Sequence, residues 1–171
     1  MKQFKNLVPI LFLFLFQNSF AQTTFVEWNF NSTPPDGSNS TGSTLPSVGA
    51  GTFTTIGGIT QSFSSGSANG GSSDPALTDN TGLQTTTFAA QGTNNNSCGI
   101  QFQASTLGYQ NIILNYDLRH SNTSSRYEQV QYTLDITATT PVWVDATTFD
   151  GNVGDTWFKN RTIDLSAVTS L

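Results

Sequence analysis

This chain of 171 residues has little of several residue types that enzymes and metal proteins commonly use. It contains one cysteine, Cys98, and one histidine, His120. A single cysteine excludes a disulfide within the chain and any metal site built from several cysteines, and one histidine is too few for most zinc sites. The sequence also has no Gly-x-Ser-x-Gly segment, the turn that carries the nucleophile of many hydrolases. Composition therefore gives no indication of a catalytic centre.

Charge is scarce as well, because only 10% of the residues are charged. If Lys2 and Lys5 leave with a cleaved leader, four cations remain against eleven acids, a net charge of −7. Proteins that bind nucleic acid need a cationic surface to neutralise phosphates. The sequence therefore predicts no nucleic-acid partner.

Long hydrophobic runs are absent except at the start. Residues 7–16 are almost wholly apolar, with Lys2 and Lys5 before them and the small residues Ser19 and Ala21 after them. This order is typical of a secretory signal peptide. The run is too short for a membrane span, which needs about 20 residues. We expect a signal peptide helix over residues 1–21, cleavage after Ala21, a secreted or cell-surface protein, and no membrane span after cleavage.

Helical periodicity is almost absent, whereas alternation of apolar and polar residues is common. Such alternation is typical of antiparallel strands with one buried face. We therefore predict an all-β domain over residues 22–171, a two-sheet antiparallel β-sandwich. Gly57-Gly58 predicts a hairpin turn, and residues 32–51 and 65–82 read as loops. The expected strands are residues 24–31, 52–56, 59–64, 98–104, 110–118, 126–136, 142–149 and 156–165.

One long block resembles a known kind of module. The segment from Gly108 through Asn115-Tyr116-Asp117-Leu118-Arg119 to Thr133 is similar to a jelly-roll β-sandwich common in large secreted bacterial proteins. Trp28-Asn29-Phe30-Asn31 and Ile163-Asp164-Leu165-Ser166 are similar to its start and its late part. The resemblance implies a concanavalin-like or galactose-binding-like jelly roll that serves as a carbohydrate-binding-like accessory module. The leader ending Phe20-Ala21-Gln22 resembles those of Bacteroidota exported proteins.

The chain departs from this module in two places. The strand ending at Tyr132-Thr133 leads to Asp135-Ile136-Thr137 instead of an Asp-Gly turn, so we expect a longer hairpin. The module also continues past the position of Leu171 with a further core strand. We therefore expect a domain that is incomplete at its C-terminal end, with further domains of the same protein beyond it. A missing strand leaves an open sheet edge and exposed apolar surface, so residues 22–171 alone are expected to be poorly soluble.

The outward faces of the later strands suggest a ligand site. If these strands are neighbours, their amides, carboxylates and aromatic rings share one face, and such groups suit the hydroxyls and ring faces of a glycan or cell-surface polysaccharide. The two arginines around residues 119–126 fit either an acidic ligand or a tied turn, and Trp143 fits either the face or the core. The candidate ligand-binding residues are Gln101, Gln103, Asp117, Arg119, Arg126, Tyr127, Gln129, Gln131 and Trp143.

Calcium is the one cofactor that the sequence suggests. Asp150, Asn152 and Asp155 form the densest cluster of side-chain oxygens, and calcium takes oxygen ligands. A plain turn is the alternative. Glu27 and Asp36 are further carboxylates that could supply ligands elsewhere.

A catalytic function has weaker support in the sequence. His120 follows Arg119 at a strand end and is expected to be a solvated loop residue. Glu27 and Glu128 are the only glutamates, and a glycosidase pair would need them to face each other. We therefore predict a non-catalytic extracellular module for attachment or carbohydrate recognition within a larger exported protein. The alternatives are a spacer without a ligand and the front piece of a secreted hydrolase or nuclease.

Overall fold

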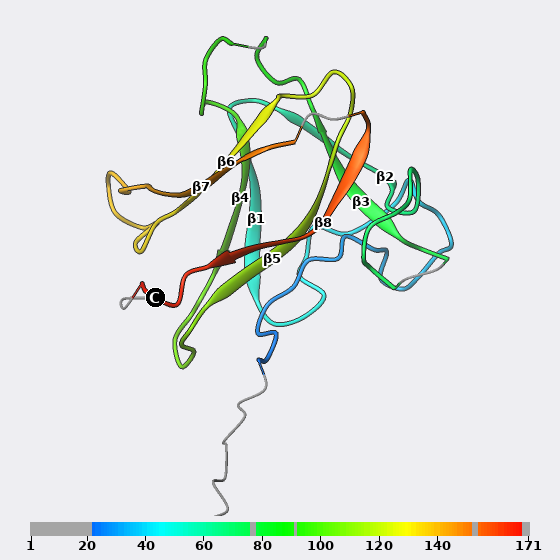
Figure 1. Ribbon diagram of the computed structural model, residues 1–171. Coiled ribbons are helices and arrows are strands. Elements are labelled where there is room, and N and C mark those ends of the chain that lie inside the picture. The colour runs from blue at the N-terminus through cyan, green and yellow to red at the C-terminus, as the bar shows by residue number, and fades with distance from the viewer. Residues whose placement is uncertain (1–21, 76–77, 91, 152–153, 169–171) are drawn as a thin grey trace, which may run out of the picture.

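The computed structural model describes residues 22–75, 78–90, 92–151 and 154–168. These residues form strands and connections without a helix, so the prediction of an all-β chain is confirmed (Figure 1). The eight strands are β1 (Gly51–Ile56), β2 (Thr60–Ser65), β3 (Thr81–Thr86), β4 (Gly99–Ala104), β5 (Ile113–His120), β6 (Tyr127–Tyr132), β7 (Val144–Asp150) and β8 (Thr156–Asp164).

The strands pair as four antiparallel ribbons of two strands each. The pairs are β1–β4, β2–β3, β5–β8 and β6–β7. In each half of the chain the first strand pairs with the fourth, and the second pairs with the third between them. In this nested order the residue before β6 lies beside the residue after β7, because the N–H of Gly151 donates to the carbonyl of Arg126 at 3.1 Å.

The turn at Gly57-Gly58 forms, but the hairpin predicted around it is wrong. Both glycines have φ of +74°, which suits a tight turn and which glycine adopts without steric cost. The two strands then part, because each pairs with a later strand. Phe53 lies opposite Phe102 in the β1–β4 ribbon, and Phe63 lies opposite Leu83 in the β2–β3 ribbon. Cross-strand pairs of this kind contribute to the stability of a ribbon.

One expected strand does not form, and one observed strand was not expected. Residues 24–31 form a single bridge, Glu27 to Val48, instead of a strand. Phe30 interrupts the extended backbone there, with φ of +62°. The strand β3 was missed because Leu83 is its one large apolar residue.

The connection from β6 to β7 is long, as the departure from the Asp-Gly pattern predicted. The strand β6 ends at Tyr132 rather than at residue 136. Asp135 ends the extended run, because its Oδ1 accepts the backbone N–H groups of Thr137 and Ala138 at 2.9 and 3.1 Å. Val144 then resumes the ribbon opposite Tyr132.

An aromatic cluster packs the N-terminal segment onto the β1–β4 ribbon. The rings of Trp28 and Phe53 lie 4.9 and 5.4 Å from that of Phe102, and Phe30 contacts both phenylalanines. Gly51 makes room for Trp28, because a Cβ at Gly51 would lie 2.6 Å from the indole ring. Phe102 nevertheless stays 42% exposed, and only Ile59 and Ile163 are buried among the apolar residues described, each 6% exposed. The core is therefore thin.

Polar contacts connect the two halves of the chain. The loop between β2 and β3 lies against one side of β8, where Trp157 Nε1 donates to the carbonyl of Ala68 at 2.8 Å. Lys159 Nζ donates to the carbonyl of Gly70 at 3.0 Å. Figure 1 shows the start of β8 beside β3, which agrees with these contacts. The relative placement of the ribbons thus depends on a few specific side chains.

Candidate functional site

The outer face of the β6–β7 ribbon carries the densest group of predicted ligand residues. Residues directly opposite each other in an antiparallel pair share a face. Six side chains therefore line one face of this ribbon, whereas Glu128, Val130 and Tyr132 point to the other. The facing pairs are Tyr127 with Asp150, Gln129 with Thr148, and Gln131 with Asp145.

Hydrogen bonds within this face fix the orientation of its two amides. Gln129 Oε1 accepts from the Thr148 hydroxyl at 2.5 Å, and its Nε2 donates to the carbonyl of Thr147 at 3.2 Å. Gln131 Nε2 donates to Asp145 Oδ1 at 2.8 Å. These bonds leave Gln131 Oε1 and Asp145 Oδ2 as acceptors with no protein partner in the described part of the chain. Hydrogen-bonding groups held in place in this way suit recognition of hydroxyl groups.

Aromatic side chains lie toward the two ends of the face. Tyr127 is 58% exposed, and the Arg126 guanidinium lies 5.1 Å from its ring centre. Trp143 is 39% exposed and precedes Asp145 by two residues, so continued alternation would place it on the same side. The strand from Tyr127 to Gln131 covers about 13 Å at roughly 3.3 Å per residue. The face is therefore an open strip rather than an enclosed pocket.

Arg126 is held at one edge of this strip. Its Nη2 and Nε lie 3.0 and 3.3 Å from Asp150 Oδ2. This hydrogen bond lowers the pKa of Asp150 and raises that of Arg126. Arg126 therefore ties the β5–β6 connection to the carboxylate at the end of β7, which agrees with the tied-turn alternative.

The other predicted ligand residues lie on different ribbons. Gln101 and Gln103 lie on β4, opposite Thr54 and Thr52 of β1. The face predicted to be shared by β4, β5 and β6 required these strands to be neighbours. Each of them instead pairs with a different strand, so this shared face is not formed.

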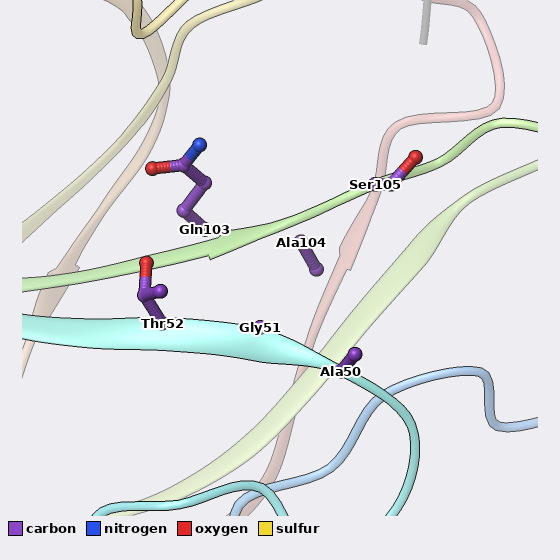
Figure 2. Close-up of a pocket in the computed structure, with 6 residues that line it drawn as sticks. All are labelled: Ala50, Gly51, Thr52, Gln103, Ala104 and Ser105. Atoms are coloured by element: carbon purple, nitrogen blue, oxygen red, sulfur yellow. The ribbon is translucent and has the colours of Figure 1, made fainter.

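Gln103 borders a shallow hollow of about 370 Å³ at one end of the β1–β4 ribbon (Figure 2). Thr52 and Gln103 project to the same side of the ribbon in this view. Binding pockets usually combine apolar or aromatic walls with a few convergent polar groups. The lining here has neither an aromatic ring nor a charge, so the hollow is a weaker candidate than the β6–β7 face. It is formed by Ala50, Gly51, Thr52, Gln103, Ala104 and Ser105.

Asp117 and Arg119 are engaged within the protein. Asp117 accepts the backbone N–H of Ser73 and, at 2.7 Å, that of Asn160. Partial burial by itself would raise the pKa of Asp117, but these N–H groups outweigh it and the pKa is lowered. Arg119 Nη2 lies 2.8 Å from Asp155 Oδ1. Both side chains therefore hold connections in place.

The same ion pairs argue against calcium at the β7–β8 connection. Asp150 pairs with Arg126 and Asp155 pairs with Arg119, so each of these carboxylates already has a guanidinium as its positive partner. Asn152, the third predicted ligand, lies outside the described residues. Within the described ranges, no group of three or more His, Cys, Asp or Glu side chains is placed to hold a metal. The described residues therefore give no support to the calcium prediction for Asp150, Asn152 and Asp155.

The prediction of a solvated His120 is wrong. His120 is the last residue of β5 and is 6% exposed, because this strand runs two residues further than the pattern predicted. Its Nδ1 lies 3.2 Å from the carbonyl of Ser125, while Nε2 is buried without a hydrogen-bond partner among the described residues. Burial lowers the pKa of the imidazole. His120 is thus a packed, neutral side chain near neutral pH.

A buried charged cluster beside His120 was not predicted. Arg161 of β8 is 8% exposed and forms an ion pair with Glu128 of β6. Its guanidinium lies 4.5 Å from the ring centres of both Phe149 and Phe158. The cluster therefore joins the β5–β8 ribbon to the β6–β7 ribbon. Glu128 serves here as a structural partner, and Glu27 lies exposed on the separate N-terminal segment.

Comparison with protein-family models, with curated proteins and with solved structures found no match. A search of the described residues for a helix long and apolar enough to cross a membrane found none.

Proposed function

We propose that this chain is a non-catalytic extracellular module that binds carbohydrate through the outer face of the β6–β7 ribbon. In this proposal it is exported by the leader over residues 1–21 and works within a larger exported protein. Its four ribbons are taken to form the two layers of a jelly-roll sandwich. The observation that carries the proposal is the alignment of Tyr127, Gln129 and Gln131 on one open face.

The chemistry of this face suits a polysaccharide better than a small ligand. Sugar rings present apolar faces to aromatic side chains and hydroxyl groups to amides and carboxylates. Tyr127 supplies the first kind of contact, and the oriented Gln131–Asp145 pair supplies the second. Because the strip is long and open, it fits an extended chain laid along the ribbon.

A glycan array probed with the full exported chain tests this proposal. Tyr127→Ala and Gln131→Ala should each weaken binding about tenfold, the effect of roughly 1.4 kcal/mol. Gln101→Ala is the matched control, because Gln101 lies on β4, in a separate ribbon. Circular dichroism of each variant should match the parent chain.

Two outcomes would contradict the proposal. Binding that survives both β6 substitutions but fails in Gln101→Ala would move the site to the β1–β4 ribbon. If the parent chain gives no signal on the array and Tyr127→Ala gives the same result, the spacer module would be favoured. Hydrolysis of an array glycan or of nucleic acid would instead support the third reading, the front piece of a secreted hydrolase or nuclease.

A further inference from the structure

The N-terminal half contains a buried carboxylate that no protein group neutralises. Asp79 is 4% exposed, and neither of its buried carboxylate oxygens accepts a hydrogen bond from an N–H or O–H donor in the described chain. An ionised carboxylate removed from water is very unfavourable unless it is paired, hydrogen-bonded or bound to a metal. Asp79 therefore requires a positive partner, which is either a proton or a cation from solution.

No basic side chain can fill this role. The described part of the chain has four cations, and each already has another partner. These contacts are Arg119 with Asp155, Arg126 with Asp150, Arg161 with Glu128, and Lys159 with the carbonyl of Gly70.

Oxygen atoms from the segment 31–41 surround the entry to β3, where Asp79 lies. Thr81 is almost fully buried, and its hydroxyl lies 3.4 and 3.2 Å from the carbonyl oxygens of Ser38 and Thr41. Asp36 Oδ2 accepts from the Thr41 hydroxyl at 2.6 Å. These contacts bring a second carboxylate, two carbonyls and two hydroxyls to the region of Asp79.

Asp36 and Asp79 also influence each other. The Thr41 hydroxyl lowers the pKa of Asp36 most, and the backbone N–H of Ser38 adds to this effect. The smallest contribution in the same direction is a hydrogen bond with the Asp79 side chain, which exists only while one of the two carboxyl groups carries a proton. Such an interaction requires the two carboxyl groups to be close together. Two neighbouring carboxylates repel each other when both are ionised, and a shared divalent cation removes this repulsion.

We propose that Asp79 and Asp36, with the carbonyl oxygens of Ser38 and Thr41, bind a calcium ion. Calcium accepts six to eight oxygen ligands in flexible arrangements that mix carboxylates, carbonyls, hydroxyls and water. Magnesium demands a tighter octahedron and keeps its own water, so it suits this irregular set less well. The ion joins the N-terminal segment to the start of β3.

With only two carboxylates, the site belongs to the weaker class of calcium sites. Extracellular modules of this class bind with dissociation constants on the order of 10⁻⁴ to 10⁻³ M. Calcium at 100 times its dissociation constant should raise the unfolding midpoint by roughly 5–10 °C.

The test titrates calcium chloride into the full exported chain by calorimetry and follows thermal unfolding with calcium, with magnesium and with EDTA. The parent chain should bind one calcium ion and melt higher with it than with magnesium. Asp79→Asn and Asp36→Asn should lose this response. Asp135→Asn is the matched control and should keep it, because Asp135 is an exposed carboxylate that caps a similar turn at Thr137.

One further measurement distinguishes a metal ligand from a residue with a structural role only. In EDTA, Asp79→Asn should be at least as stable as the parent chain, because the substitution removes an uncompensated buried charge. A parent chain that binds no calcium, or a calcium response that survives in Asp79→Asn, would overturn the proposal. An equal response to magnesium would overturn the assignment to calcium. If Asp79→Asn does not fold, Asp36→Asn and the parent chain in EDTA decide the question in the same way.

Discussion

Arg161 makes the sharpest prediction about stability, because it is a buried charge that contacts two ribbons at once. It pairs with Glu128 across the ribbons and lies between the rings of Phe149 and Phe158. We consider Arg161→Met, which keeps an unbranched apolar side chain of similar length. The change leaves Glu128 as a half-buried carboxylate without its partner.

The expected cost follows from the burial of the pair. Removing one member of a buried ion pair destabilises a protein by about 3–5 kcal/mol, mainly because the other charge stays buried and uncompensated. Contacts between the new thioether and the two rings contribute about 0.3–1.5 kcal/mol, which partly offsets the lost cation–π attraction. A net loss of about 3 kcal/mol would move the urea midpoint by about 1.5 M, at a slope of about 2 kcal/mol/M.

A double-mutant cycle is the deciding assay. Arg161→Met and Glu128→Leu should each be strongly destabilising, whereas the double variant should lie within about 2 kcal/mol of the parent, because an apolar pair replaces a buried ionic one. Equilibrium urea unfolding, followed by tryptophan fluorescence, measures all four proteins. If the two single effects simply add to within about 0.5 kcal/mol, the charges do not interact and the assigned role of Arg161 is refuted.

Three further predictions concern the same half of the chain and the leader. Gly151→Ala should be clearly destabilising, because a Cβ there would lie 2.6 Å from Arg161 Nη2 and 2.7 Å from His120 Nε2. Gly99→Ala is the control and should change the urea midpoint little, because a Cβ at Gly99 meets nothing within 4 Å. Equal effects of the two substitutions on the urea midpoint would contradict this packing. Because the folded pKa of His120 is lowered, the unfolded chain binds the extra proton first; stability should therefore fall as the pH drops below about 6.5 and continue falling through the folded pKa. His120→Leu should flatten that slope, and a slope that persists in the variant would assign it elsewhere. N-terminal sequencing of the exported protein should begin at Gln22, and a chain that retains Met1 would contradict the signal peptide.

The local features of the fold were predictable because they depend on neighbouring residues. Alternation on β4 predicted Phe102 on one side and Gln101 and Gln103 on the other, and the register with β1 agrees with this. Alternation on β6 likewise predicted a shared side for Tyr127, Gln129 and Gln131. Side chains point to opposite faces at every second residue in any strand, whichever strand it pairs with.

Strand pairing was not predictable from the same pattern. The nearest strands in sequence, β1 and β2, have a suitable glycine turn between them but do not pair. Pairing depends on which distant apolar residues meet, such as Phe53 with Phe102, and a single sequence does not report such contacts. For this reason the candidate face was predicted as one surface over β4, β5 and β6. In the structure the candidate residues of β6 share one face, whereas those of β4 and β5 lie on other ribbons.

The buried cluster was missed for a more specific reason. Strict period-two alternation in β8 would place Arg161 on the same side as Trp157 and Lys159, so the pattern does not mark it as buried. The register between β5 and β8 shifts near Tyr116, and Asn160 adopts φ of +54° there. This irregularity turns Arg161 inward, while Trp157 and Lys159 still contact the loop of the other half. An extra residue in a strand reverses every later side chain, and the sequence carries no mark of it.

The arrangement of the ribbons gives these polar contacts their importance. An isolated two-stranded ribbon is marginally stable in water, and few apolar residues of the described chain are buried. The Arg161–Glu128 pair joins two of them, and Trp157 joins β8 to the loop of the first half. In the proposed calcium site, Asp79 would attach the N-terminal segment to the ribbon that begins at Thr81. Each of these connections is ionic or hydrogen-bonded rather than apolar. Acid, chelator and single-charge substitutions that break them should therefore unfold the whole chain, because a separated ribbon is not stable on its own.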